Sequence, residues 1–126
     1  MKFLVIDDSA TMRRIIVNSL QRIGYTDCLE AADGTEALRV FTPDIGMIIT
    51  DWNMPTMTGV DFVRALRQRP DGKAVPVLMV TTRSIKQDVV QAVEAGVNNY
   101  IVKPFTPQVL KEKIDQVLSN AAAPTN

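Results

Sequence analysis

The sequence contains no histidine and a single cysteine, Cys28, among its 126 residues. These absences exclude an intramolecular disulfide, a zinc site of the usual cysteine and histidine type, and a triad or proton shuttle that depends on histidine. Enzymes whose catalysis depends on such zinc sites, triads or proton shuttles are thereby excluded. The function must be sought in local clusters of other polar residues.

An excess of charge of either sign is also missing, because 14 lysines and arginines balance 14 aspartates and glutamates. No overall basic field directs the protein to nucleic acid or to an anionic membrane. The apolar run at residues 1–6 is too short for a signal peptide or a transmembrane span. We therefore expect a cytoplasmic monomer with neither nucleic acid nor membrane as a partner.

Short apolar runs, each followed by a polar or acidic residue, alternate along the chain with longer amphipathic stretches, a pattern typical of a single α/β domain of five βα units. We expect strands at residues 2–7, 27–31, 47–51, 75–81 and 99–103. Most of these runs are continuously apolar, which favours a parallel sheet covered on both faces. Residues 27–31 alternate in polarity, which favours an edge position.

Capping patterns mark where the intervening helices begin and end. We expect starts at Asp33 with Glu36, Thr58 with Asp61, Ser84 with Gln87 and Thr106 before Pro107, and stops at Gly24, Gly96 and the Pro70-Asp71-Gly72 turn. Residues 1–120 are predicted to form the domain. The low-complexity residues 121–126 are predicted to be a disordered tail.

Polar side chains at the carboxyl ends of four strands converge on one rim of the predicted sheet, where ligands of doubly wound folds bind. They are Asp7, Asp8, Asp51, Thr81 and Lys103. Carboxylates crowded together repel by about 4 kcal/mol per pair at 4 Å and an effective dielectric near 20. One alternative is that the acids only cap helices, as Asp8 or Ser9 would, but capping requires neither three acids on one rim nor a lysine partner.

The ligands available on this rim are hard oxygens, which suit Mg²⁺ or Mn²⁺ and argue against zinc or copper. The small number of protein ligands favours magnesium that keeps several waters. A carboxylate, a divalent cation, an ammonium and a hydroxyl together are what an incoming phosphoryl group needs. Asp51 is the natural nucleophile for such a group.

These motifs also resemble a known family. Asp7-Asp8, the run from Asp51 to Pro55, the strand from Pro76 to Thr81 and the run from Tyr100 to Thr106 are similar to the receiver domains of two-component response regulators, especially the single-domain regulators of chemotaxis. The resemblance extends from Lys2 to about Leu118. It implies a flavodoxin-like parallel sheet of order 2-1-3-4-5.

The resemblance also implies roles for the rim residues. Asp51 would accept a phosphoryl group from a phosphohistidine on a sensor kinase. Asp8 and Asp51 would bind Mg²⁺ directly, Asn53 through its backbone carbonyl and Asp7 through water.

Thr81 and Lys103 would contact the phosphoryl oxygens, and Tyr100 would be an aromatic switch beside Thr81. A cis peptide between Lys103 and Pro104 would aim the lysine at the site.

Two residues near the rim need separate interpretation. Arg83 stands two residues after Thr81, where many family members carry an acid or a small polar residue. We expect it to tune the rate of dephosphorylation by shielding the acyl phosphate, although a solvated arginine at a helix entry would look the same in sequence. Trp52 is expected to be partly exposed near the metal, because adjacent strand residues face opposite sides.

The expected function is a phosphorylation-operated signalling switch that acts by binding partners, because only a six-residue tail follows the fifth helix. A sensor histidine kinase is the expected phosphodonor, a flagellar motor switch protein the expected target, and a phosphatase a candidate partner. The exchange face would comprise the fourth helix, fifth strand and fifth helix. Its candidate residues are Ser84, Lys86, Val89, Tyr100, Val102 and Lys113.

Other functions on the same architecture remain open. A phosphorelay intermediate would use the same residues. A phosphatase with an aspartate nucleophile would require a cap that covers its substrate, and no insertion in this sequence is long enough to form one. A flavin carrier would require a phosphate-binding loop rich in serine, threonine and glycine after the first strand. Asp7 and Asp8 stand there instead and would repel a phosphate unless a metal intervened. We expect no enzyme activity beyond the protein's own phosphorylation and slow dephosphorylation.

Overall fold

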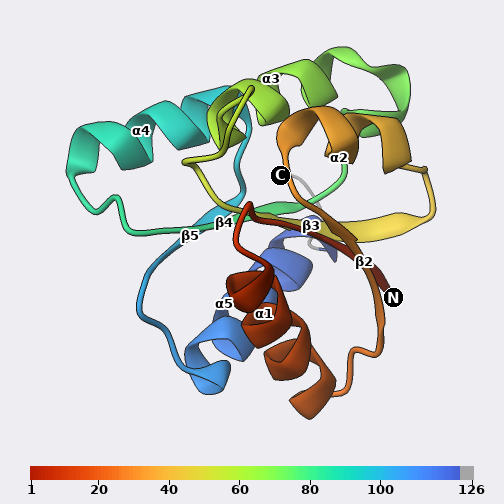
Figure 1. The fold of residues 1–126 in the computed structure, drawn as a ribbon, viewed down its shortest axis with the longest axis vertical. Helices are drawn as coiled ribbons and strands as arrows, with labels where there is room; N and C mark the ends of the chain where they lie inside the picture. The colour runs from red at the N-terminus through yellow and green to blue at the C-terminus, as the bar shows by residue number, and fades with distance from the viewer. Residues whose placement is uncertain (123–126) are drawn as a thin grey trace.

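The computed structural model describes residues 1–122 as a five-stranded sheet between two layers of helices (Figure 1). The elements in chain order are β1 (Lys2–Ile6), α1 (Ala10–Arg22), β2 (Asp27–Ala31), α2 (Gly34–Val40), β3 (Ile45–Thr50), α3 (Gly59–Gln68), the short 3-10 helix η1 (Pro70–Gly72), β4 (Val77–Thr81), α4 (Lys86–Ala95), β5 (Asn99–Val102) and α5 (Pro107–Ala122). The predicted α/β class and its five βα units are confirmed.

All strand pairs are parallel, and the order across the sheet is β2-β1-β3-β4-β5. This is the predicted flavodoxin-like order, with β2 at one edge as its alternating polarity indicated. Figure 1 shows α1 and α5 on one face of the sheet and α2, α3 and α4 on the other. The carboxyl ends of the central strands therefore share one rim.

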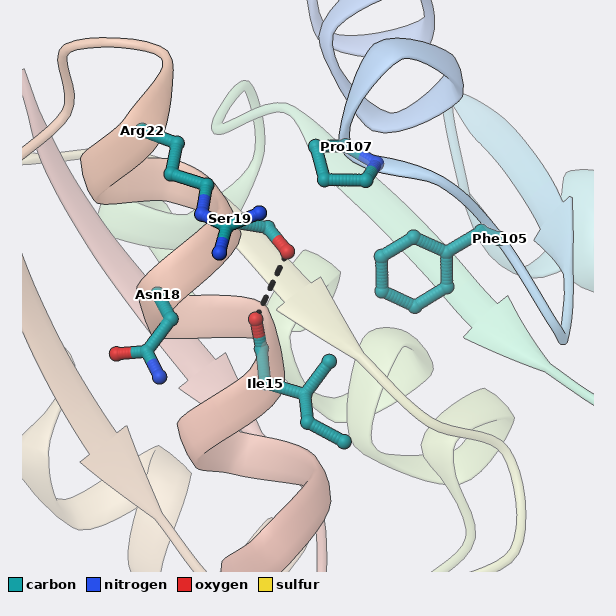
Figure 2. A pocket seen from close by; sticks show the side chains of 6 residues that line it. All are labelled: Ile15, Asn18, Ser19, Arg22, Phe105 and Pro107. Atoms are coloured by element: carbon teal, nitrogen blue, oxygen red, sulfur yellow. Dashed lines mark hydrogen bonds between the residues drawn. The ribbon is translucent and has the colours of Figure 1, made fainter.

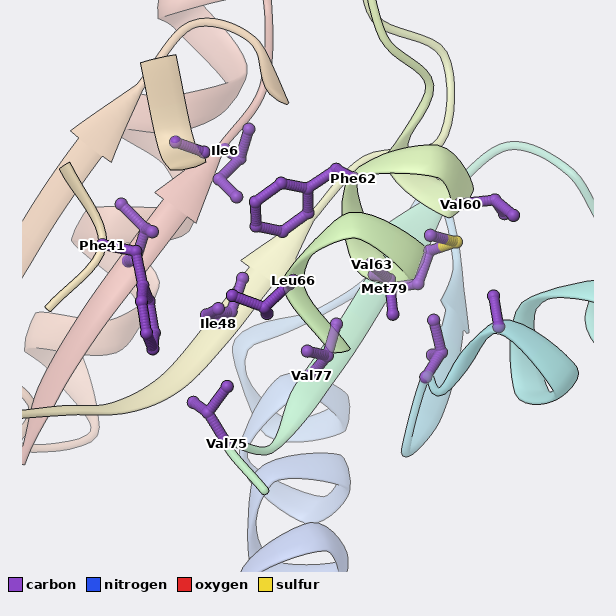
Figure 3. Packing of buried hydrophobic residues seen from close by; sticks show 14 of the residues in the cluster. Ile6, Phe41, Ile48, Val60, Phe62, Val63, Leu66, Val75, Val77 and Met79 are labelled. Atoms are coloured by element: carbon purple, nitrogen blue, oxygen red, sulfur yellow. The ribbon is translucent and has the colours of Figure 1, made fainter. Parts of the chain in front are cut away.

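The continuous apolar strands are explained by two cores, one on each face of the sheet. Successive strand residues point to opposite faces, so Leu4 and Ile6 belong to one cluster while Phe3 and Val5 belong to the other. Figure 3 shows the first cluster, in which the ring of Phe62 on α3 lies beside Ile6. Burial on both faces fixes the position of the rim.

Helix capping follows the sequence at three of the four predicted starts. The Asp33 and Thr58 side chains accept backbone N–H groups of α2 and α3, and Thr106 accepts one of α5. The prediction at Ser84 is wrong, because α4 begins at Lys86 and has no side-chain cap. The N-cap position is held by Ile85, which is extended and has no side-chain oxygen to accept the first helical amides.

The carboxyl end of the chain also differs from the prediction. Helix α5 includes residues 121 and 122, which were expected to begin a disordered tail. Residues 123–126 of that predicted tail lie outside the described part of the chain.

Candidate functional site

Three carboxylates meet at the rim where β1 and β3 end. Ile6 pairs with Thr50 across these strands, so the next residues, Asp7 and Asp51, leave the sheet side by side. Oxygen atoms of Asp7, Asp8 and Asp51 all lie within 4.8 Å of one another. The structure thus brings together on one rim the three acids that the sequence placed at these strand ends.

Lys103 reaches this acidic group from the end of β5. Its Nζ lies 3.0 Å from Asp51 Oδ2 and 3.3 Å from Asp7 Oδ2. The side chains are 13% exposed for Lys103, 12% for Asp51 and 2% for Asp7, so water screens these pairs poorly. The peptide between Lys103 and Pro104 is cis, as the family resemblance implied. A positive charge thus sits among the acids.

The balance of burial and charge differs for the two partners of this pair. Burial raises the pKa of Asp7, while the Ser9 amide and Lys103 only partly oppose that shift. Burial acts to lower the pKa of Lys103, but the hydrogen bond and charge of Asp51, together with Asp7, outweigh it and raise the pKa. Lys103 therefore stays protonated at neutral pH.

The donor set fits a hard divalent cation. Ligands around Mg²⁺ sit about 2.1 Å from the ion and hence about 3 to 4 Å from one another, which the spread of the three carboxylates accommodates. Ser9, and not Asp8, caps α1, since its hydroxyl accepts the Met12 amide. Asp8 is exposed and makes no hydrogen bond or ion pair among residues 1–122, so its carboxylate is available as a ligand.

Thr81 and Tyr100 both contact the backbone of Arg83. Thr81 ends β4 and is fully buried, and its hydroxyl accepts the Arg83 N–H at 3.4 Å. The Tyr100 hydroxyl donates to the Arg83 carbonyl at 2.8 Å. The segment between β4 and α4 is thus linked to the end of one strand and to the aromatic side chain of another.

The Arg83 guanidinium lies across the neighbouring loop and is not free in solvent. It donates to Asn53 Oδ1 at 3.0 and 3.3 Å, lies 4.6 Å from the centre of the Trp52 ring, and pairs with Asp88 at 3.5 Å. The contact with Asn53 leaves the Asn53 backbone carbonyl as the atom for the metal role that the family resemblance implies. Asp88, in the first turn of α4, is a contact that sequence reasoning missed.

Trp52 is buried, at 4% exposed, so the prediction of partial exposure is wrong. Helix α3 starts directly against this backbone. The Gly59 amide donates to the Trp52 carbonyl at 2.7 Å, and a Cβ at Gly59 would lie only 2.0 Å from the Asp51 carbonyl oxygen. The ring joins the core below α3, where burial of its apolar area is favourable, and Arg83 covers it.

The predicted exchange face contains exposed and half-buried residues. Ser84, Lys86 and Val102 are exposed, whereas Val89, Tyr100 and Lys113 are half-buried. Ile85 and Val93 are also exposed, at 60% and 57%, and were not predicted. An apolar residue at a helix entry, as at Ile85, was the available signal.

A hollow of about 270 Å³ lies apart from the acidic residues, between α1 and the start of α5. Figure 2 shows its lining, in which the Ser19 hydroxyl donates to the Ile15 carbonyl on the same helix. The lining contains no carboxylate. Within residues 1–122, no helix is both long and apolar enough to cross a membrane.

Comparison with known proteins identifies a single family over almost the whole chain. Residues 3–115 match the response regulator receiver domain. The chain is 56% identical to chemotaxis protein CheY1 of Helicobacter pylori over 120 residues, covering 94% of this chain and 97% of that protein. It is 53% identical to a CheY homolog of Campylobacter jejuni over 124 residues, covering 97% and 95%.

A solved structure agrees with these sequence matches. The chemotaxis response regulator CheY4 of Vibrio cholerae superposes with a TM-score of 0.84 at 38% identity, covering 92% of this chain and 97% of that one.

Proposed function

The chain belongs to the response regulator receiver family, and we propose that phosphorylation of Asp51 switches it into a form that binds a partner protein. The supporting observation is the Asp51 carboxylate, 3.0 Å from the Lys103 ammonium and grouped with Asp7 and Asp8 at the rim. A nucleophile flanked by a fixed cation and two further acids suits phosphoryl transfer, in which charge neutralisation contributes most of the catalysis.

The proposed transfer is an in-line displacement at phosphorus. A carboxylate oxygen of Asp51 forms the new P–O bond while the P–N bond to the donor imidazole breaks, and the imidazole leaves with its electron pair and takes up a proton. The Trp52 amide, 2.6 Å from Asp51 Oδ1, orients the carboxylate, and Lys103 supplies positive charge beside it.

We assign the metal site to Asp8, Asp51 and the Asn53 backbone carbonyl, with Asp7 acting through water. Mg²⁺ bound there would neutralise negative charge on the phosphoryl oxygens. Thr81 would donate its hydroxyl to one of those oxygens.

The signal would leave the site through Thr81, Arg83 and Tyr100. Movement of the Thr81 hydroxyl toward the phosphoryl group would release the Arg83 amide that it now accepts. The Arg83 carbonyl is also the partner of Tyr100, so the change extends to the face formed by α4, β5 and α5. A shift of 1 to 3 kcal/mol between two such states is typical of coupling between sites.

We expect the donor to be a sensor histidine kinase of a cytoplasmic signalling pathway. The names of the relatives favour chemotaxis, and we propose a flagellar motor switch protein as the target. The contact with this target would involve the exchange-face residues Ser84, Lys86, Val89, Val102 and Lys113. A phosphorelay intermediate would instead pass its phosphoryl group to a second histidine.

The test begins with acetyl phosphate and Mg²⁺, which should add one phosphoryl group to the wild type and none to Asp51→Asn, as measured by mass spectrometry. Modification at another residue, or none with Mg²⁺ present, would contradict the assignment. Capture from a lysate of the source cells, with and without phosphodonor, then distinguishes the two roles. Retention of a motor component supports the motor-switch target, whereas transfer of the phosphoryl group to a histidine of another protein supports the phosphorelay.

Thr81→Ala should still be phosphorylated but should gain less partner affinity on phosphorylation, because the hydroxyl that couples the site to Arg83 is gone. Binding titrations of both forms of both proteins measure the gain. An equal gain in Thr81→Ala and wild type would show that the signal does not pass through Thr81.

A further inference from the structure

Arg13, in the first turn of α1, contacts the backbone that carries two of the acids. Its Nη1 donates to the Asp7 carbonyl oxygen at 2.6 Å. Its Nε lies 3.2 Å from Glu30 Oε1 on β2. The Arg13 side chain is 18% exposed, so both contacts are partly shielded from water. One guanidinium thus connects the end of β1, the first turn of α1 and the sheet edge.

The segment from Asp7 to Ser9 is fixed at several backbone groups. The Asp7 amide donates to the Ala31 carbonyl at 3.2 Å, and the Ser9 amide donates to Asp7 Oδ1 at 2.9 Å. Arg13 holds the carbonyl that lies between these two amides. The exposed Asp8 side chain has no hydrogen-bond partner among residues 1–122, so the backbone on either side determines where its carboxylate lies.

We propose that Arg13 is a positioning residue for the Mg²⁺ site, which it serves by fixing the Asp7 carbonyl and with it the direction of Asp8. This inference rests on the metal site of the proposed function. Residues that orient metal ligands without touching the metal typically contribute tenfold to a hundredfold in metal affinity.

Charge and position predict opposite effects at Arg13. A positive charge near the acids repels a divalent cation, so electrostatics alone predicts tighter Mg²⁺ binding when Arg13 is removed. The positioning role predicts weaker binding. The direction of the change therefore separates the two explanations.

Arg14 provides a matched control. It carries the same charge one residue along α1, is exposed, and makes no hydrogen bond or ion pair within the described part of the chain. Both arginines line the same surface hollow of about 400 Å³. Neither arginine belongs to the two hydrophobic clusters, so alanine at either position removes no side chain from the cores.

The experiment is calorimetric titration of Mg²⁺ alone into wild type, Arg13→Ala and Arg14→Ala, at a temperature where circular dichroism shows each to be folded. We expect the dissociation constant to rise about tenfold in Arg13→Ala and to stay the same or fall in Arg14→Ala. Arg13→Lys, which keeps the charge but has one nitrogen for two partners, should lie between wild type and Arg13→Ala. It decides the question if the alanine variant does not fold.

Equal or tighter Mg²⁺ binding by Arg13→Ala, or by Arg13→Lys where that variant decides, would overturn the positioning role. A loss of folding stability without a change in affinity would do the same, because it would make Arg13 merely structural. Failure of the wild type to bind Mg²⁺ would instead overturn the proposed function, and this inference with it.

Discussion

Replacement of Lys103 by methionine tests how the acidic cluster is held together in the absence of metal. Methionine has a similar length but no charge, so Asp7 and Asp51 would lose the ammonium that lies 3.3 and 3.0 Å from them. Both carboxylates would remain on the rim, largely shielded from water. Each would keep one backbone amide donor, from Ser9 and Trp52 respectively, but neither would keep its ammonium partner. The variant should therefore be less stable than the wild type at neutral pH.

The magnitude follows from the two distances. At an effective dielectric near 20, each ion pair contributes about 5 kcal/mol of Coulomb attraction, from which the cost of taking the ammonium out of water, several kcal/mol, must be subtracted. Loss of one partner from a buried ionic group typically costs about 3 to 5 kcal/mol. We expect Lys103→Met to lower the free energy of unfolding by about 3 kcal/mol. Mg²⁺ should restore part of this lost stability, because the Lys103 ammonium no longer competes with it for the carboxylates.

Urea denaturation at pH 7, in chelator and then in Mg²⁺, measures both effects. Lys111→Met is the control, since Lys111 pairs with Asp115 at 2.8 Å on the surface, where both side chains are about half exposed. The free energy of unfolding of Lys111→Met should differ little from that of the wild type. An unchanged unfolding free energy for Lys103→Met in chelator, or a smaller stabilisation by Mg²⁺ than in the wild type, would refute the reasoning.

Three further predictions concern single side chains. Asp7→Asn should be more stable than wild type at pH 7 in chelator, and the difference should shrink in acid. The pKa of Asp7 is raised on folding, so the protonated carboxyl stabilises the folded state. That contribution is complete below the unfolded value of 3.8 and is lost as the pH rises through the folded pKa. A pH series of urea titrations measures this. Arg83→Ala should shorten the phosphorylated lifetime several-fold, equivalent to about 1 kcal/mol in barrier, in single-turnover decay with saturating Mg²⁺; an unchanged or longer lifetime contradicts shielding. Thr58→Ala should cost about 1 kcal/mol of stability through the lost cap of α3, whereas Ser84→Ala, at a residue that caps no helix, should cost much less in the same thermal melts.

The sheet could be predicted closely because apolar strands buried on both faces are continuous in sequence. The predicted ends of β1, β3 and β5 are one residue too late, and the larger errors, of two residues, lie at strand starts. Strand β3 begins at Ile45, two residues before the predicted start, because the pairing with β1 shifts register there and passes over Gly46. Strand β4 begins at Val77, after Pro76, which has no N–H to donate to a ladder. Neither the register shift nor the late start of β4 changes the hydrophobic pattern of the sequence, so that pattern does not reveal them.

The rim acids and Lys103 could be placed together from sequence because each stands within two residues of a strand end, and parallel strands end on one side. Trp52 and Arg83 could not, because their environment depends on residues distant in sequence. The Trp52 ring is covered by the guanidinium of Arg83, 4.6 Å from its centre, which comes from the far end of β4. Arg83 lies where Asn53, 30 residues earlier, offers an oxygen. Sequence spacing identifies which residues leave the sheet together, but not what packs above them.

The missing side-chain cap of α4 has a consequence for local dynamics. At this end of α4 the N–H groups of the first turn have no side-chain acceptor, in contrast to those of α1, α2 and α3. Local opening of this turn therefore requires less free energy, and its amides should exchange with solvent deuterium sooner than those of the capped turns. The same turn lies next to Ile85 and carries Asp88, the partner of Arg83. A partner that bound there, as we propose for the face formed by α4, β5 and α5, would have to order this turn, so its affinity would depend on how often the turn is already ordered.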